Sequence, residues 1–180
     1  KQNYLNVKTQ YPPVDLSNFR ILSDREKSEI RKKHNISEDT YIITQVCRNQ
    51  LRKLFPNQIE AYSMFRRQNP KVKSILLLVT SFGEGWDIMK LAKQYNVPED
   101  EIFAVYVSDE CSEYAMTKLQ GNQLNCPWTG KENACHTVNI LRGVSEQQLN
   151  EIYNITDVIS HPATSGGCEL PLVEAAAAGK

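Results

Sequence analysis

Short apolar segments alternate with amphipathic ones along this chain, and the alternation limits the folds open to it. Tyr41–Cys47 is rich in β-branched residues and predicts a strand, and apolar residues at helical spacing in Pro56–Gln68 predict a helix after it. Ser74–Thr80 is apolar along its whole length, which is typical of a parallel strand covered on both faces. Trp86–Tyr95 returns to helical spacing. This part of the chain therefore predicts two consecutive strand-helix units.

The alternation continues toward the end of the chain. Ile102–Val107, Val138–Leu141 and Val158–Ser160 are predicted strands, and Ser145–Asn154 and Leu170–Ala178 are predicted helices. Repeated units of this kind imply an α/β domain with a Rossmann-like open parallel sheet, right-handed crossovers and helices on both faces. Such sheets bind ligands beyond the carboxyl ends of their strands. The loops after the predicted strands are therefore the expected places for a site.

Two segments do not fit this alternation of strands and helices. Ser23–Asn35 is a charged segment in which Ser23 and Glu26 have the spacing of a capping box, so it predicts an outer helix leading into the domain. Ser108–His136 is long and polar and lacks clear periodicity. Loops of this length are usually functional or mobile, and we expect a mobile or irregular excursion without a structural metal.

Length and charge limit the classes of function. With 180 residues, one domain is the default, and we assign residues 1–22 to an entry segment and residues 23–180 to the domain itself. The 21 Lys and Arg residues balance the 21 Asp and Glu residues, so no overall field favours nucleic acid or an anionic membrane. No apolar run is long enough to span a bilayer, and Lys1–Tyr11 lacks the apolar core of a signal peptide.

The five cysteines are scattered without paired CxxC spacing, which favours reduced thiols in a cytoplasmic protein. Cys111, Cys126, Cys135 and His136 would permit a metal site by ligand type. Their spacing matches no familiar metal motif, so we expect no bound metal.

The first candidate site follows the first predicted strand. Arg48 and Lys53 stand near its carboxyl end, where a guanidinium and an ammonium could together neutralise a diphosphate. We expect both side chains to converge on one crevice that faces the start of the helix at Leu170. The alternative is a solvated basic turn, since basic residues are common in loops.

The second candidate site runs from His161 to Ala175. Gly166 and Gly167 let the backbone approach a ligand closely, and the helix that follows has free amides at its start, which favour an anion. Glu174 lies one to two turns into this helix, where its carboxylate could accept hydrogen bonds from the hydroxyls of a ribose. The alternative is a carboxylate that the helix dipole stabilises.

Three motifs occur in an order that resembles the carboxyl-terminal, donor-binding domain of family 4 (group 1) retaining glycosyltransferases of the GT-B fold. They are PVDLSNF at Pro13–Phe19, CRNQLRK at Cys47–Lys53, and the stretch Gly143–Lys180. In that family an Arg is followed five residues later by a Lys. The last motif reads Pro-Ser, a short loop, Glu-Gly-Phe-Gly-Leu-Pro, then Glu-Ala. The resemblance covers nearly the whole chain except Ser108–His136.

The resemblance implies a role for each matched residue. Arg48 and Lys53 would bind the donor diphosphate and stabilise the leaving group, so they are also the catalytic candidates, and Glu174 would bind the ribose. The loop around Arg142 and Gly143 would hold the base. The donor-binding segment would comprise Gly166, Gly167, Cys168, Glu169 and Leu170, with amides of Gly167–Glu169 on the distal phosphate.

One position departs from the family pattern. The family's first glutamate, which helps to orient the donor sugar, falls on Gly166. Glu169 stands where the family usually has glycine, and it could reach the sugar instead.

The resemblance also implies that the chain is incomplete. We expect an acceptor-binding amino-terminal domain to be missing, and a further strand and helices to follow Lys180. The fragment alone would then be inactive, and the parent enzyme would be cytoplasmic, with the missing domain able to hold it at a membrane surface.

The sequence is compatible with four functions. The first is a glycosyltransferase that moves a sugar from a nucleoside-diphosphate donor without cofactor or metal, in keeping with the absence of an Asp-x-Asp motif. The second is a nucleotide-sugar-binding module without transfer, which Gly166 favours. The third is a nucleotide-sugar epimerase, in which the terminal motif is not expected. The fourth is an α/β domain without a ligand.

Overall fold

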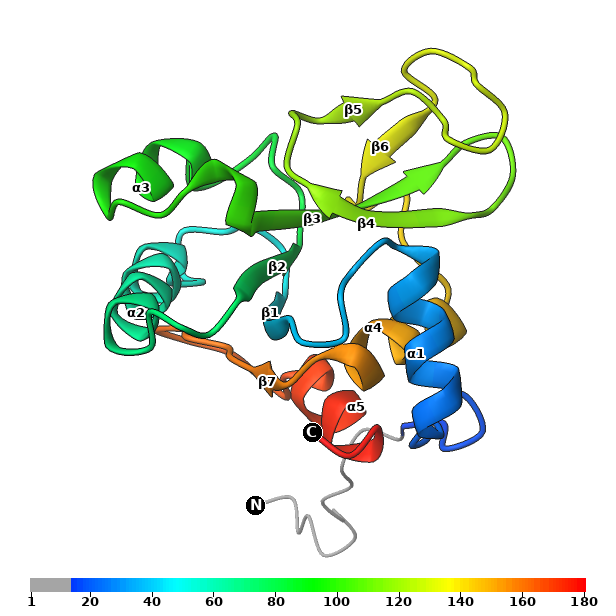
Figure 1. Cartoon of the computed structure of the whole chain (residues 1–180), viewed down its shortest axis with the longest axis horizontal. Helices are drawn as coiled ribbons and strands as arrows, with labels where there is room; N and C mark the ends of the chain where they lie inside the picture. The colour runs from blue at the N-terminus through cyan, green and yellow to red at the C-terminus, as the bar shows by residue number, and fades with distance from the viewer. Residues whose placement is uncertain (1–13) are drawn as a thin grey trace, which may run out of the picture.

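The computed structural model of the protein describes residues 14–180. The predicted entry segment is therefore described only from Val14 onward. The segment Lys1–Tyr11 and Pro13 of the first motif lie outside the described residues. Helices and strands alternate along the chain except between residues 102 and 137, where four strands follow one another (Figure 1). The helices are α1 (Asp24–Lys33), α2 (Phe55–Gln68), α3 (Ile88–Gln94), the 3-10 turn η1 (Glu99–Glu101), α4 (Glu146–Ile155) and α5 (Leu170–Ala177). The strands are β1 (Tyr41–Val46), β2 (Ser74–Val79), β3 (Ile102–Ser108), β4 (Tyr114–Lys118), β5 (Gln123–Leu124), β6 (Cys135–Thr137) and β7 (Val158–Ile159).

Four strands form the parallel part of the sheet, in the order β3-β2-β1-β7. β1 and β2 pair over their full length, from Tyr41 opposite Ser74 to Val46 opposite Val79. Every residue of β2 is buried, as its continuous apolar sequence predicts for a strand with neighbours on both edges and helices on both faces. The parallel strands place the loops after β1, β2 and β7 at one edge of the sheet.

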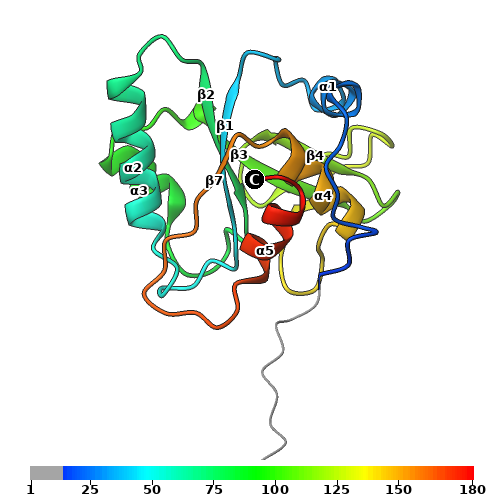
Figure 2. The same ribbon diagram turned by 90° about the horizontal axis from the view of Figure 1, so that it is seen from below.

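The side chains of β2 alternate between two hydrophobic clusters, one on each face of the sheet. Leu76 and Leu78 belong to the cluster under α2 and α3, and Leu77 belongs to the cluster under α1, α4 and α5. Figure 2 shows these two groups of helices on opposite sides of the sheet. The predicted α/β class with helices on both faces is confirmed.

β3 carries an antiparallel extension of the sheet, which consists of β4, β5 and β6. β4 pairs with residues 103–107 of β3, β6 pairs with residues 106–108, and β5 pairs with β6. The prediction that residues 108–136 are irregular is therefore wrong, because they contain two strands and the start of a third. The strand predicted at residues 138–141 is also wrong, because β6 ends at Thr137. β5 and β6 have only two and three residues, which is too few to show the alternating pattern of a strand in the sequence.

Capping residues begin two of the helices where the sequence predicts. The Ser23 hydroxyl accepts from the Glu26 amide and the Glu26 carboxylate accepts from the Ser23 amide, which makes the predicted capping box of α1. Ser145 and Gln148 form the same arrangement at α4.

Two asparagines of α4 hold the entry segment against the domain. The Arg20 amide donates to Asn150 Oδ1 at 3.1 Å, and the Leu22 amide donates to Asn154 Oδ1 at 2.8 Å. Asn154 Nδ2 in turn donates to the Arg20 carbonyl at 2.9 Å, and Phe19 is buried in the core beside them. This segment is therefore fixed to α4 by its backbone as well as by apolar packing.

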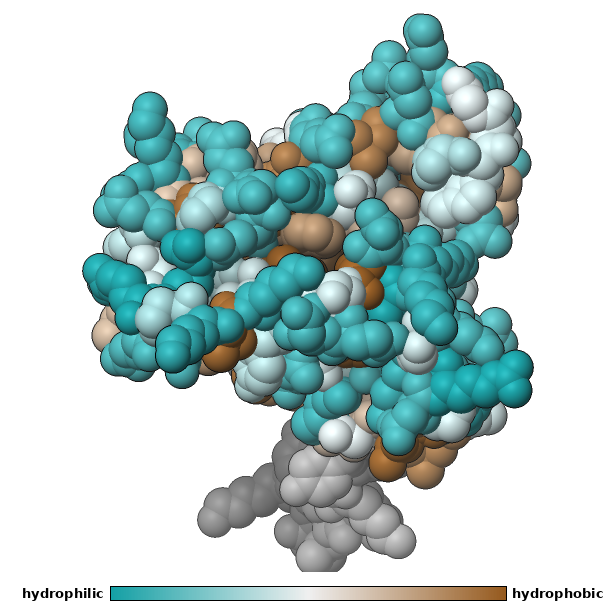
Figure 3. All heavy atoms as spheres, in the orientation of Figure 1, coloured by the Kyte–Doolittle hydropathy of each residue, from teal (hydrophilic) through white to brown (hydrophobic). Residues whose placement is uncertain are grey.

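Hydrophilic side chains cover most of the molecular face in Figure 3, and apolar atoms emerge there only in small groups. Between Val14 and Lys180, no helix is both long and apolar enough to cross a membrane.

Candidate donor site at the carboxyl edge of the sheet

A pocket of about 240 Å³ opens at the carboxyl ends of β1 and β2. Residues 46–48 line it from β1, and residues 79–81 with Glu84 line it from β2. Residues 138–140, which follow β6, close the remaining side. The pocket is therefore at the edge where parallel α/β sheets bind their ligands.

Arg48 lies on the rim of this pocket and binds Glu84 with two parallel contacts. Arg48 Nε is 2.9 Å from Glu84 Oε1, and Arg48 Nη2 is 2.8 Å from Glu84 Oε2. The hydrogen bond with Glu84 raises the pKa of Arg48, and the same contact lowers the pKa of Glu84. The Arg48 guanidinium thus presents a fork that fits a phosphate as well as a carboxylate.

Lys53 is buried on the other side of the same loop, with 3% of its side chain exposed. Its Nζ is 2.6 Å from Glu169 Oε1 and 2.9 Å from His161 Nε2. His161 Nε2 also lies 2.9 Å from Glu169 Oε2. The hydrogen bond from Lys53 lowers the pKa of Glu169, and burial followed by the charge of Lys53 lowers the pKa of His161. Lys53, His161 and Glu169 therefore form one compact cluster beside the start of α5.

Backbone pairing between two distant loops positions this cluster. Lys53 and Ala163 form an antiparallel bridge, and the Leu54 amide donates to the Pro162 carbonyl at 3.0 Å. Because β1 and β7 are neighbours in the sheet, the loops that follow them meet at the same edge. The cluster is thus assembled by the sheet order.

Gly166 lies directly beside the Glu169 carboxylate. A Cβ atom placed on Gly166 would be only 1.8 Å from Glu169 Oε1. The Glu169 carboxylate therefore occupies the space in which a side chain at position 166 would begin. By contrast, a Cβ atom placed on Gly167 or Gly143 would have no neighbour within 4 Å.

Glu174 lies on α5 and contacts the neighbouring helix α4. Its Oε2 accepts a hydrogen bond from the Tyr153 hydroxyl at 2.8 Å. Burial, followed by the charge of Glu174, raises the pKa of Tyr153 above its ordinary value. One oxygen of Glu174 thus has a protein partner in addition to its predicted ligand.

Arg142 points toward the antiparallel extension of the sheet. Its Nη1 is 2.8 Å from Asp109 Oδ2, and His136 Nε2 is 2.8 Å from the same oxygen. Two further residues of the predicted site lie on the surface at the start of α5: Cys168, just before the helix, is exposed, and Leu170, its first residue, is 41% exposed.

The structure brings Lys53, Glu169 and Gly166 together beside α5. Arg48 lines the pocket at the strand ends and Lys53 does not, so the prediction that both side chains converge on one crevice is wrong. Sequence reasoning missed Glu84 as the partner of Arg48, and it included His161 in the second candidate site without giving it a role. Both follow a strand at its carboxyl end, after β2 and β7, and that position was the signal that could have identified them.

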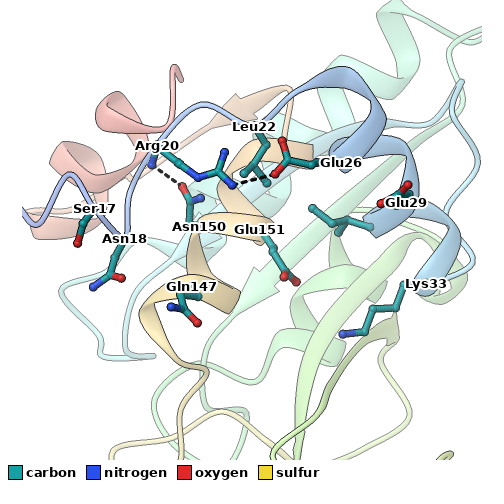
Figure 4. A pocket seen from close by; sticks show the side chains of 11 residues that line it. Ser17, Asn18, Arg20, Leu22, Glu26, Glu29, Lys33, Gln147, Asn150 and Glu151 are labelled. Carbon is teal, nitrogen blue, oxygen red and sulfur yellow. Dashed lines mark hydrogen bonds and ion pairs between the residues drawn. The ribbon is translucent and has the colours of Figure 1, made fainter.

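A second hollow of about 440 Å³ lies between α1 and α4 (Figure 4). Its wall includes Glu26, Glu29 and Glu151, and Arg20 is already paired with Glu26 at 2.8 Å. This hollow is lined by helices rather than by strand ends, and its carboxylates would repel a diphosphate. Within residues 14–180, no group of three His, Cys, Asp or Glu side chains is arranged to hold a metal ion.

No protein-family model and no curated protein matches the sequence. Several solved structures have a similar fold, among them the following two. Sucrose-phosphate synthase from Thermosynechococcus elongatus has a TM-score of 0.57 and 18% identity, covering 93% of this chain and 32% of that one. The C-terminal domain of a glycosyl transferase group 1 family protein from Francisella tularensis has a TM-score of 0.56 and 15% identity, covering 92% of this chain and 66% of that one. This chain therefore spans about a third of the first structure and just under two thirds of the second. It has the α/β fold of carboxyl-terminal domains of GT-B glycosyltransferases.

Proposed function

We propose that this domain binds the donor in a retaining glycosyltransferase of the family 4 type, which transfers a sugar from a nucleoside-diphosphate sugar to an acceptor. One observation carries the proposal. A single short loop after β1 supplies Arg48 to the pocket at the strand ends and Lys53 to the cluster beside α5. Two cations at the carboxyl edge of a parallel sheet match the charge and the usual place of a bound diphosphate.

The reaction breaks the bond between the anomeric carbon of the sugar and the diphosphate oxygen. Negative charge therefore grows on the leaving diphosphate as the bond stretches. Arg48 and Lys53 would stabilise this charge from positions that the fold fixes in advance, which is the most effective form of electrostatic catalysis. This role needs no metal, and we propose that none takes part.

Each cation already has a carboxylate partner in the absence of a donor. The pair of Arg48 and Glu84 lies at the surface, with 47% and 31% of the side chains exposed, so an incoming phosphate could replace Glu84 at small cost. Lys53 and Glu169 are less exposed and are held by His161 as well. We therefore expect a donor to displace Glu84 and to bind beside Glu169.

Glu169 would take over the role that Gly166 cannot fill. In the resembled family, a glutamate at the position of Gly166 helps to orient the donor sugar. Here the carboxylate of Glu169 reaches the space next to Gly166 from three residues further along the chain. We propose that Glu169 accepts hydrogen bonds from the sugar hydroxyls, while Glu174 accepts them from the ribose and the loop at Arg142 and Gly143 holds the base.

A nucleotide-sugar-binding module without transfer is the second candidate. The contact of 2.6 Å between Lys53 and Glu169 favours it, because that carboxylate offsets the charge available to a leaving diphosphate. In the leading proposal, Glu169→Ala abolishes sugar transfer by the full-length protein and leaves nucleotide affinity nearly unchanged. In the second, the full-length protein binds the nucleotide sugar without transferring or hydrolysing it.

Calorimetric titration of UDP, GDP and ADP into the chain tests donor binding. We expect one of the three nucleotides to bind and Arg48→Ala to weaken it by tenfold or more, since a hydrogen bond to a charged group contributes about 1.5–3 kcal/mol. Arg25→Ala is the matched control, because Arg25 is also an exposed arginine paired with a glutamate, Glu29, but lies on α1. Equal losses in the two variants, or a folded chain that binds none of the nucleotides, would contradict the proposal.

We also propose that a further domain binds the acceptor and that the protein is cytoplasmic. Activity would require that further domain, so the 180 residues alone would bind a donor without transferring its sugar.

A further inference from the structure

One buried side chain joins the loops that follow β1 and β2. Asn49 comes directly after Arg48 and has only 1% of its surface exposed. Its Nδ2 donates to the Trp86 carbonyl at 2.9 Å, and its Oδ1 accepts from the Trp86 amide at 2.9 Å. The pairing of β1 with β2 ends at Val46 and Val79. The Asn49 amide therefore continues, beyond the ends of the strands, the connection that backbone pairing makes within the sheet.

A glycine allows the two loops to approach each other this closely. Gly85 has a φ angle of +67°, a conformation that disfavours a side chain. A Cβ atom placed there would be 2.1 Å from the Asn49 carbonyl oxygen and 2.7 Å from Asn49 Oδ1. The indole of Trp86 adds a further contact, because its Nε1 donates to the Leu51 carbonyl at 3.3 Å. The loop after β2 thus holds the loop after β1 by side chain, by indole and by close backbone packing.

The exposed ion pair of Arg48 with Glu84 is too weak to fix this loop by itself, since water competes for both of its partners. The two hydrogen bonds of Asn49 are shielded from water, and a buried polar group that loses its partner destabilises the arrangement strongly. Asn49 is also too buried to touch a ligand. Any effect of Asn49 on the pocket must therefore act through its neighbour Arg48.

We propose that Asn49 is a positioning residue of the donor site, which holds Arg48 at the pocket before a nucleotide arrives. The inference rests on the proposed function, in which Arg48 binds the donor diphosphate. A loop released from Trp86 spends only part of its time with Arg48 at the pocket, and the apparent affinity falls by that fraction. If Arg48 keeps its place in about one molecule in ten, the nucleotide binds about tenfold more weakly.

Calorimetric titration of Asn49→Ala tests the proposal, with whichever of UDP, GDP and ADP binds the unaltered chain. We expect binding to weaken by about tenfold. Asn154→Ala is the matched control, because Asn154 is equally buried and its amide holds the backbone of Arg20 and Leu22 in the same way, from α4. This control variant should lose stability and keep its affinity for the nucleotide.

The same substitution in the Arg48→Ala background separates positioning from a general loss of structure. If Asn49 acts through Arg48, its removal there should change the affinity by less than about twofold. NMR without nucleotide gives a second measure, because Arg48 Nε donates to Glu84 in the unaltered chain. The Arg48 Nε–H signal should move toward that of a free arginine side chain in Asn49→Ala and stay in place in Asn154→Ala.

Trp86→Phe provides a milder variant in case Asn49→Ala does not fold. It removes only the hydrogen bond of the indole to Leu51, so it should weaken binding about twofold, and only while Arg48 is present.

Three results would overturn the proposal: unchanged affinity in Asn49→Ala, an equal loss in Asn154→Ala, or the same loss with and without Arg48. A folded, unaltered chain that binds none of the three nucleotides would overturn the proposed function instead. In that case an unchanged Arg48 signal in Asn49→Ala would overturn the positioning role as well.

Discussion

Gly166→Ala should displace the Glu169 carboxylate from Lys53. The new Cβ would lie 1.8 Å from Glu169 Oε1, so that oxygen must retreat by about 1.6 Å or more to reach ordinary contact. Gly166 does not have a positive φ angle, so alanine adds no backbone strain there. The flexible end of Glu169 moves more easily than the backbone, and the contact of 2.6 Å with Lys53 is the interaction that breaks.

The expected loss follows from the burial of the pair. A hydrogen bond between charged groups contributes about 1.5–3 kcal/mol, and breaking a fully buried ion pair costs about 3–5 kcal/mol. Glu169 retains 23% exposure, so water can partly replace Lys53 as its partner. We therefore expect the free energy of unfolding to fall by about 1.5–2 kcal/mol, measured by urea denaturation followed by circular dichroism.

A double-mutant cycle separates this mechanism from a general effect of alanine in the loop. In the Glu169→Ala background, Gly166→Ala should cost less than about 0.5 kcal/mol, because the displaced group is already gone. Gly167→Ala is the matched control, since its Cβ would meet no atom within 4 Å. If Gly166→Ala costs the same with and without the Glu169 carboxylate, the proposed displacement is refuted.

Three further predictions concern single side chains. Glu174→Ala should weaken nucleoside-diphosphate binding by about tenfold in calorimetry, whereas Tyr153→Phe, which removes the contact of Glu174 with the protein alone, should not weaken it. Equal losses would show that Glu174 is structural. Glu84→Gln should tighten the binding of the same nucleotide several-fold, because Glu84 competes with phosphate for Arg48; unchanged affinity would show that Arg48 does not contact the ligand. Burial lowers the pKa of His34 to about 4, so the native state holds this side chain neutral. Its stabilising contribution is complete above pH 6.5 and is lost as the unfolded chain binds the proton, by roughly 2 kcal/mol at pH 5, and His34→Gln should flatten this pH dependence in urea unfolding.

The parallel strands and their helices could be predicted because each carries its own signal. β2 is apolar throughout since both of its faces are covered, and Ser23 and Ser145 mark helix starts through contacts three residues away. The antiparallel extension had no comparable signal. β5 and β6 have only two and three residues, and their pairing partners lie elsewhere in the chain. Only β4, in which Tyr114 and Met116 are buried and their neighbours are more exposed, showed a period of two.

The candidate site was predicted by position but not by contact. Arg48 and Lys53 could be placed at the carboxyl edge, because they directly follow a strand. Their partners Glu84 and His161 come from other loops, and only the order of strands in the sheet determines that they meet. In the sequence, glycine at position 166 indicates that the family's contact with the donor sugar is missing. In the structure, the absence of a side chain at Gly166 leaves the space that the Glu169 carboxylate occupies.

The cluster around Lys53 joins two parts of the chain that are made at different times. Lys53 lies 108 residues before His161 and 116 residues before Glu169. A growing polypeptide therefore exposes this lysine to water long before either partner has been synthesised, and β1 lacks its neighbour β7 for the same interval. Contacts of such long sequence separation form late and slowly in folding. Burial of the Lys53 ammonium therefore comes late in folding, and an incompletely synthesised chain presents a solvated lysine where the finished domain holds a buried contact with Glu169.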